Sequence, residues 1–259
     1  MKRVWDTFPF SGELDLLEAR LTELDGVVYR HVLVESALTY TGRAKPLYYA
    51  ENRDRFAAWA DRIVHVVADN ADQTSNPGRE WAQRNALWHG LQDYEAGDVL
   101  ITGDADEIPH PGDLAALAEF EGRWRPWKIM HKHHPVAVNL RDWTYWGGYV
   151  PHRGTGRPDM LELRQRLHSR VIRTREGRGW HFSWLGGPEA MKVKARTLLE
   201  TDYANIMDNG AGSFYRDKLN PGSGDRQLEL VDIDGTWPRF MQERRGPAWW
   251  YWPGPGGEG

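Results

Sequence analysis

The amino-acid sequence predicts an α/β protein whose sheet is mainly parallel and carries helices on its faces. Along the first hundred residues, short apolar runs alternate with segments of helical periodicity. Parallel strands need such helical crossovers, because each strand ends at the edge opposite to the start of the next. In addition, three carboxylates (Asp104, Asp106 and Glu107) follow the apolar run VLIT at residues 99–102. Ligands of open α/β sheets bind beyond the carboxyl ends of the strands, so this position indicates a site.

The elements of the first half follow from apolar spacing and turn residues. Leucines recur at helical spacing from Leu14 to Leu24, with Ser11 as the candidate N-cap and Gly26 as the stop. Asn76 and Pro77 fit the cap and first turn of a later helix. Strands are expected at residues 2–8, 27–36, 63–68 and 99–102, and helices at 11–26, 55–62 and 79–97, joined by loops at 37–54 and 69–80.

After Pro111 the alternation weakens. A short helix is expected at residues 113–121 and a strand within 127–140, whereas residues 142–160 are aromatic and Gly-rich. Residues 169–200 indicate two short strands, a loop and a helix.

The chain has 259 residues, no cysteine and no sharp linker. We therefore expect a single domain over residues 1–245, divided into halves at 1–110 and 111–245, and followed by a non-helical Trp/Pro/Gly-rich tail at 246–259. The absence of cysteine excludes disulfides and thiolate metal sites within this sequence.

Charge and composition narrow the range of partners. The 33 basic and 37 acidic residues are interspersed and give a net charge of -4, so no nucleic-acid partner is indicated. We find neither a signal peptide nor a transmembrane segment, and expect a cytoplasmic protein, with peripheral membrane association as the alternative. Fourteen tryptophans are many for this length, and their flat apolar faces suit the C–H faces of sugars as well as protein cores.

The acidic stretch has several interpretations. Carboxylates at positions i and i+2 of an extended turn can bind one divalent cation together with phosphate oxygens. An EF-hand loop is excluded because Pro109 stands where that loop needs glycine. A phosphatase-type nucleophilic aspartate and a solvated turn remain as alternatives. The location after a buried strand favours the metal and phosphate site.

Several longer segments carry a resemblance. The sequence resembles glycosyltransferase family 17 in VWDTFPFSGELDLLEARLTEL (4–24), VLVESALTYTGRAKPL (32–47), REWAQRNALWHGL (79–91), GDVLITGDADEIP (97–109) and, more weakly, GWHFSW (179–184). The match is good over residues 4–112 and weak over 176–200.

The resemblance implies a GT-A-type fold, with a Rossmann-like mixed sheet flanked by helices, and an inverting, metal-dependent transfer. It implies a UDP-sugar donor, typically UDP-GlcNAc, bound in the half at 1–110, and a divalent metal, Mn²⁺ or Mg²⁺. The half at 111–245 would bind a glycan acceptor. Because animal members carry a membrane anchor and a luminal domain that this sequence lacks, we expect a bacterial or phage-type glycan in place of an N-glycan.

The resemblance also implies roles for individual residues. Asp104, Asp106 and His181 are the expected metal ligands, although a histidine beside aromatic residues is as often structural. The expected donor-binding residues are Glu35, Thr41, Lys45, Arg84, Asn85, Asp104 and Asp106, with Ser36 and Gly42 in the same loop. His131 and His133 lie on one strand face, where a groove wall is favoured over a zinc site because zinc needs three or four ligands.

An inverting transfer needs a general base. Glu189 and Glu107 are the favoured candidates, with Asp142 and Asp159 as alternatives, and Glu107 could equally act behind the metal ligands or at a helix terminus. The expected acceptor-stacking residues are Trp143, Trp146, Trp180 and Trp184, with Tyr145 beside them.

Two hypotheses compete with the transferase. A non-catalytic carbohydrate-binding protein on a transferase scaffold would bind glycan without nucleotide or metal. A phosphohydrolase with Asp104 as nucleophile would release phosphate from an aryl phosphate. The intact Asp104/Asp106 pair favours the transferase.

Overall fold

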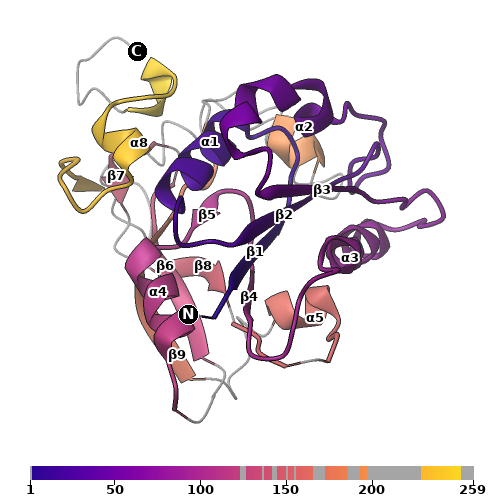
Figure 1. The fold of residues 1–259 in the computed structure, drawn as a ribbon. Helices are drawn as coiled ribbons and strands as arrows, with labels where there is room; N and C mark the ends of the chain where they lie inside the picture. The colour runs from indigo at the N-terminus through magenta and orange to yellow at the C-terminus, as the bar shows by residue number, and fades with distance from the viewer. Residues whose placement is uncertain are drawn as a thin grey trace.

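Figure 1 shows the fold of the chain in a computed structural model. The structure describes residues 2–122, 127–135, 137–141, 145–149, 151–154, 156–165, 173–185, 193–197 and 229–251.

The centre of the fold is a four-stranded parallel sheet, called here the first sheet. Its strands are β1 (Val4–Pro9), β2 (Arg30–Glu35), β3 (Ile63–Val67) and β4 (Val99–Thr102), in the order β3-β2-β1-β4. All of its neighbouring pairs are parallel. The parallel sheet expected from the alternating sequence is therefore confirmed, and each predicted strand of the first half is present.

Apolar residues of successive strand positions pack on opposite faces of the first sheet. Leu33 of β2 packs with Leu17 and Leu21 of α1 (Leu14–Glu23). Its neighbours Val32 and Val34 pack instead with Leu87 and Trp88, in a 3₁₀ helix that spans Ala86–Gly90. The strands are thus apolar on both sides, as a sheet covered by helices on both faces requires.

The helices of the first half differ from the expectation in several places; in particular, the helix expected at 55–62 is a 3₁₀ segment, and Ser75 rather than Asn76 is the N-cap of the later helix. Helix α1 is preceded by Glu13 rather than Ser11. The predicted loop at 37–54 contains a short helix, α2 (Tyr48–Glu51), followed by 3₁₀ turns at Arg53–Trp59. The helix expected at 79–97 is α3 (Asn76–Asn85), capped by the Ser75 hydroxyl, and continues only as the 3₁₀ segment to Gly90.

Close packing against the sheet explains why that helix tightens. A Cβ atom added at Gly90 would lie 2.4 Å from Cγ1 of Val32. The backbone at Gly90 therefore approaches β2 more closely than a larger residue would allow, and the chain turns away toward β4.

A second, mixed sheet completes the fold. It contains β5 (Glu107–Ile108), β6 (Trp127–His133), β8 (Tyr145–Tyr149) and β9 (Arg173–His181), in the order β5-β9-β6-β8. Strands β6 and β9 are parallel, whereas β5 is antiparallel to β9 and β8 to β6. The mixed α/β architecture is confirmed, although β9 is one long strand where two short ones were expected.

The remaining elements flank the two sheets (Figure 1). Helix α4 (Pro111–Glu119) packs Leu114 and Ala118 against β6 and β8. Helix α5 (Met160–Gln165), which the sequence did not predict, packs on α3 and β4. The other short elements are β7 (Leu140–Arg141), its antiparallel partner β10 (Glu229–Leu230), α8 (Arg239–Gln242), a helical segment at 193–197 and a 3₁₀ turn at Ala248–Trp250.

The tail begins as a packed segment, since Trp250 is buried beside Phe240. The domain limits at residues 110 and 245 stay predictions. None of the helices in the described ranges combines the length and apolar character that a bilayer-crossing segment needs.

The two-sided core of the first sheet predicts a large effect of Leu33→Ala. Leu33 is fully buried, so the substitution leaves a cavity and should lower the free energy of unfolding by about 2–5 kcal/mol. Urea unfolding followed by circular dichroism measures the change. Val67→Ala, on the exposed side of β3, is the control and should stay within about 0.5 kcal/mol of wild type; equal losses in the two variants would contradict the assignment of the core.

Candidate active site

The carboxylates lie in a turn that joins the two sheets. This acidic turn, residues 103–107, leaves the carboxyl end of β4 and enters β5. The Gly103 N–H donates to the Thr7 carbonyl of β1 at 3.1 Å, and the Phe182 N–H donates to the Asp106 carbonyl at 2.9 Å. The turn is therefore tied to both sheets at the sheet edge where α/β proteins bind ligands.

Asp104 is held by two arginines from different helices. Nη2 of Arg84, in α3, lies 2.7 Å from Oδ1, and Nη2 of Arg164, in α5, lies 3.1 Å from Oδ2. Burial by itself would raise the pKa of Asp104, but the two guanidinium groups outweigh it and hold that pKa well below its usual range. Asp104 is thus an ionised carboxylate with both oxygens paired.

Asp106 faces a lysine and a histidine. Nζ of Lys194 lies 2.6 Å from Oδ2, and Nε2 of His181 lies 3.6 Å from Oδ1. Burial lowers the pKa of His181 to about 4, although Asp106 opposes this shift. His181 is therefore a neutral imidazole near pH 7, and within the described ranges its Nδ1 has no hydrogen-bond partner.

Glu107 stabilises the acidic turn through hydrogen bonds to both of its carboxylate oxygens. Its Oε1 accepts from Nη2 of Arg164 at 2.7 Å, and its Oε2 accepts from the Asp104 N–H at 2.9 Å. Burial, opposed by Arg164 but reinforced by the two nearby aspartates, raises the pKa of Glu107 to about 8. With 1% of its surface exposed, Glu107 holds Arg164 and the turn, and its role as general base stays a prediction.

The donor chemistry of Asp106 and His181 fits a divalent metal. Carboxylate oxygen and neutral imidazole nitrogen both bind Mn²⁺. Their 3.6 Å separation is close to the ~3 Å between adjacent ligands of an octahedral ion with bonds of about 2.1 Å. The described residues include no group of three His, Asp or Glu side chains arranged around one point. Such a trio is not required, because Mg²⁺-type sites commonly use one or two protein carboxylates with water and phosphate oxygens.

The end of β2 and the loop after it contain three of the predicted donor residues: Glu35 is the last residue of the strand, whereas Thr41 and Lys45 lie in the loop. Glu35 accepts the Tyr49 and Ala50 N–H groups at the start of α2 and also contacts His65 at 3.0 Å. Its carboxylate thus organises the loop. The Thr41 hydroxyl donates to the Arg196 carbonyl at 2.8 Å and so joins this loop to the segment that carries Lys194.

Lys45 is the residue of this loop best suited to meet an anion. Its Nζ is buried and has no hydrogen-bond partner among the described residues, and it lies 5.4 Å from the centroid of the Tyr48 ring. Burial lowers its pKa. A buried ammonium group without a partner is costly, so a bound anion would be favourable here.

Asn85 and Asp159 connect α3 to α5. The Asn85 amide donates to Asp159 at 3.2 Å and accepts from the Met160 N–H at 3.1 Å. Asp159 also accepts the Glu162 N–H at 2.8 Å at the start of α5. Both side chains therefore position the helix that carries Arg164, and the donor contact expected of Asn85 and the base role considered for Asp159 stay predictions.

The tryptophans that were predicted to stack on the acceptor lie in different environments. Trp180 is buried in the core and packs beside His110, so in this structure its face cannot stack on a sugar. Trp184 is half-buried, has a positive φ of 60° and lies 5.8 Å from Lys194 Nζ, so it is beside the site. Glu189, Asp142 and Trp143, and the side chains of Tyr145 and Trp146, lie outside the described residues.

The histidine pair does not form a zinc site among the described residues. His131 is buried beside Tyr149, whereas Nε2 of His133 lies 2.7 Å from the Ser183 hydroxyl. The centroid of the His133 ring lies 5.2 Å from that of His181, so His133 packs beside this candidate metal ligand.

Sequence reasoning missed Arg164, Lys194 and Arg20, which all contact the acidic turn. They lie 60, 88 and 84 residues from their partners Asp106 or Asp104, so no local motif contains them. The available signal was the charge itself, because buried carboxylates require nearby cations.

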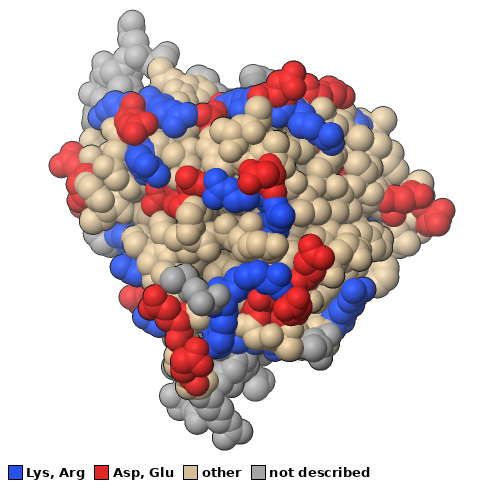
Figure 2. All heavy atoms as spheres, in the orientation of Figure 1, with Lys and Arg blue, Asp and Glu red and all other residues tan. Residues whose placement is uncertain are grey.

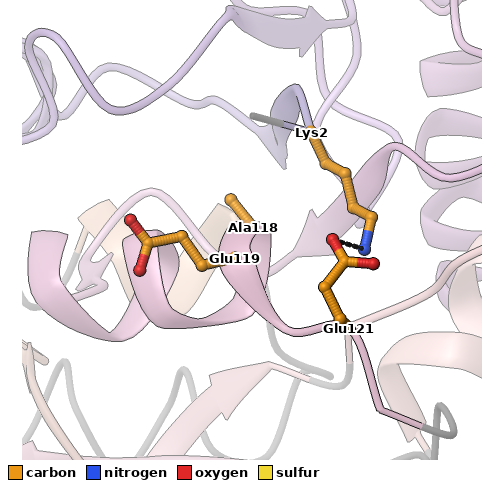
Figure 3. A pocket seen from close by; sticks show the side chains of 4 residues that line it. All are labelled: Lys2, Ala118, Glu119 and Glu121. Atoms are coloured by element: carbon orange, nitrogen blue, oxygen red, sulfur yellow. Dashed lines mark hydrogen bonds and ion pairs between the residues drawn. The ribbon is translucent and has the colours of Figure 1, made fainter.

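Other surface features lie away from the turn. A pocket lies beside the start of β1, at the edge of the first sheet opposite to the acidic turn (Figure 3). It is lined by Lys2, Ala118, Glu119 and Glu121. Figure 2 shows basic and acidic side chains interspersed on the face in view, which agrees with the expectation from the sequence.

The buried titratable groups predict a stability maximum near pH 6.5. Burial lowers the pKa of His134 to about 3 and that of His131 well below 6.5. Together with His181, these histidines take up protons on unfolding below pH 6.5, so stability falls there by about 1.4 kcal/mol per net proton and pH unit. Glu107 is protonated in the fold and ionised when unfolded between about pH 4.5 and 8, so its contribution is lost as pH rises toward 8.

Urea midpoints at pH 5, 6.5 and 8 measure this profile. Three histidines outweigh one glutamate below pH 6.5, so the midpoint should rise from pH 5 to 6.5 and then decline. Glu107→Gln, which keeps an acceptor for Arg164, should remove the decline. A midpoint that keeps rising to pH 8 in wild type would rule out the raised pKa of Glu107.

Comparison with known proteins gives the family. The model of glycosyltransferase family 17 matches residues 1–145. The rat and human proteins named beta-1,4-mannosyl-glycoprotein 4-beta-N-acetylglucosaminyltransferase are each 25% identical over 260 residues and match 84% of this chain. The match spans 45% of the rat and 46% of the human protein, so this chain corresponds to about half of their length.

Solved structures show weaker similarity. A 4-diphosphocytidyl-2C-methyl-D-erythritol synthase has a TM-score of 0.41 and 16% identity over 80% of this chain and 98% of its own. Glucosyl-3-phosphoglycerate synthase from Mycobacterium tuberculosis, with Mg²⁺ and UDP, has a TM-score of 0.33 and 12% identity over 78% and 81%. The family match, in contrast, covers more than half of the chain and includes the whole acidic turn, and the chain therefore belongs to glycosyltransferase family 17.

Proposed function

We propose that this protein is an inverting, metal-dependent glycosyltransferase that moves N-acetylglucosamine from UDP-GlcNAc to a hydroxyl of a glycan. The observation that carries the proposal is the acidic turn at the end of β4, with its carboxylates among Arg84, Arg164 and Lys194. Membership of the family supports the reaction class. The names of the rat and human relatives support N-acetylglucosamine as the sugar.

The mixture of charges suits a sugar nucleotide. A diphosphate binds to guanidinium and ammonium groups, and three such groups line the turn. Asp106 and His181 would hold the divalent metal, with Asp104 kept as the third proposed ligand, and the metal would supply positive charge to the departing diphosphate. Asp104 orients Arg84 and Arg164 by pairing with both. Lys45, whose Nζ has no partner in the described part of the chain, is the proposed further contact to the donor.

The transfer itself exchanges one bond to the anomeric carbon for another. The acceptor oxygen attacks that carbon from the side opposite to UDP, the bond to the diphosphate oxygen breaks, and UDP leaves with the electron pair. A base takes the proton of the acceptor hydroxyl. We keep Glu189 as the proposed base, because Glu107 is buried and already paired with Arg164.

Trp184 is the proposed acceptor-stacking residue among those described. Its ring is adjacent to Lys194, which itself contacts Asp106. A sugar ring stacked on Trp184 would thus lie close to the donor, as the transfer requires. Trp143 and Trp146 remain proposed as additional acceptor contacts.

Calorimetric titration tests the donor site. UDP-GlcNAc should bind wild-type protein in the presence of Mn²⁺ and much more weakly without it. Asp106→Asn removes a metal-binding charge and should weaken Mn²⁺-dependent binding by about tenfold or more. Asp15→Asn is the matched control, because Asp15 pairs with Arg55 on the surface, and its affinity should equal that of wild type.

UDP release then tests transfer. With UDP-GlcNAc and a panel of glycans that includes β-mannosides, wild type should release UDP only with certain acceptors. Glycan binding by folded protein without any nucleotide binding would replace the proposal with a non-catalytic carbohydrate-binding protein. Phosphate release from an aryl phosphate would replace it with a phosphohydrolase.

A further inference from the structure

A buried ionic network lies directly behind the acidic turn. It consists of Asp6 in β1, Arg20 in α1 and His31 in β2, with 0%, 1% and 1% of their surfaces exposed. None of these residues is in a position to contact solvent or a ligand. Any effect of the network on function must therefore pass through the backbone carbonyls to which Arg20 donates.

The Arg20 guanidinium contacts two different parts of the molecule. Its Nε and Nη2 donate to the Asp6 carboxylate at 2.8 and 2.6 Å. Its Nη1 donates to the carbonyl of Asp104 at 3.1 Å and to that of Glu107 at 2.5 Å. One planar group thus connects the central strand to both ends of the segment that presents Asp104 and Asp106.

Asp6 fixes the orientation of this guanidinium. The bidentate pairing sets the plane of the fork, and Nδ1 of His31 lies 2.9 Å from Oδ2 of Asp6 on the other side. Burial would raise the pKa of Asp6, but Arg20 and then His31 lower it below its usual value. The carboxylate is therefore ionised and directs Nη1 toward the turn.

Stability alone does not account for such a network. Replacing a buried ion pair by apolar residues is often neutral or stabilising, because the desolvation of both charges is costly. What apolar residues at these positions could not do is donate two hydrogen bonds to carbonyls of the turn. These carbonyls have to be held if the two aspartates are to point toward α3, α5 and β9 as they do.

We propose that Arg20 is a positioning residue that sets the conformation of the acidic turn for binding of the metal and the diphosphate. The inference rests on the proposed function for its ligand, but its structural part concerns the turn alone. The two parts are measured separately.

Arg20→Lys is the appropriate variant. Lysine keeps a positive charge against Asp6, but its single ammonium group cannot replace a fork that reaches the carboxylate and both carbonyls. Arg55→Lys is the matched control, since Arg55 also pairs with α1, through Asp15 and Glu18, but at the surface and away from the turn.

The first measurement is amide hydrogen exchange of peptides that cover residues 103–108, compared with peptides of β1 and β2. In Arg20→Lys, exchange in the turn should be faster by about tenfold or more while the strands exchange as in wild type. The second is calorimetry with Mn²⁺ and UDP, in which affinity should fall by about tenfold or more. Arg55→Lys should leave both quantities unchanged.

The outcomes are distinguishable. Wild-type exchange in the turn of a folded Arg20→Lys protein would overturn the inference, as would acceleration that is equal in the turn and the strands, because a general structural role predicts the latter. Failure of wild type to bind Mn²⁺ and UDP would refute the proposed function while the exchange still decides whether Arg20 holds the turn. If Arg20→Lys does not fold, Asp6→Asn takes its place, because it releases the orientation of the fork while Arg20 remains, and the same exchange criteria apply.

Discussion

The structure depends on the pairing of buried carboxylates with cations that arrive from other elements. Asp106 is buried and only 34% of the Asp104 side chain is exposed, so water stabilises their charges only in part. Arg84, Arg164 and Lys194 provide the compensation from α3, α5 and the segment at 193–197. Because the three cations come from different elements, the turn is paired in full only when all three elements are in place.

The same turn also joins the two sheets. Because it runs from β4 directly into β5, and β5 pairs with β9, His181 is brought opposite Asp106. The turn after β4 thus supplies the carboxylates, whereas β9 supplies the imidazole of His181, and the turn after β9 supplies the ring of Trp184.

Under the proposed function, charge compensation within the chain would also serve donor binding. Arginine and lysine neutralise the aspartates, and under the proposed function the same cations would face the diphosphate while a divalent metal would share the carboxylate charge. The buried Arg20 differs from these residues, because its contacts are to carbonyls and to Asp6. It belongs to the framework that holds the turn rather than to the surface that meets the ligand.

The sequence by itself determined the succession of strands and helices along the first half of the chain and the place of the acidic turn, because both follow from local patterns: apolar periodicity and a cluster of charge after a buried run. It did not determine α5, the length of β9 or the presence of Arg164, Lys194 and Arg20 at the turn. Only the tertiary structure decided that Asn85 and Glu35 organise neighbouring helices and that Trp180 is a core residue. The physical reason is that hydrogen bonds and ion pairs between residues 60 to 88 positions apart depend on how the sheets and helices pack, and no local sequence pattern carries that information.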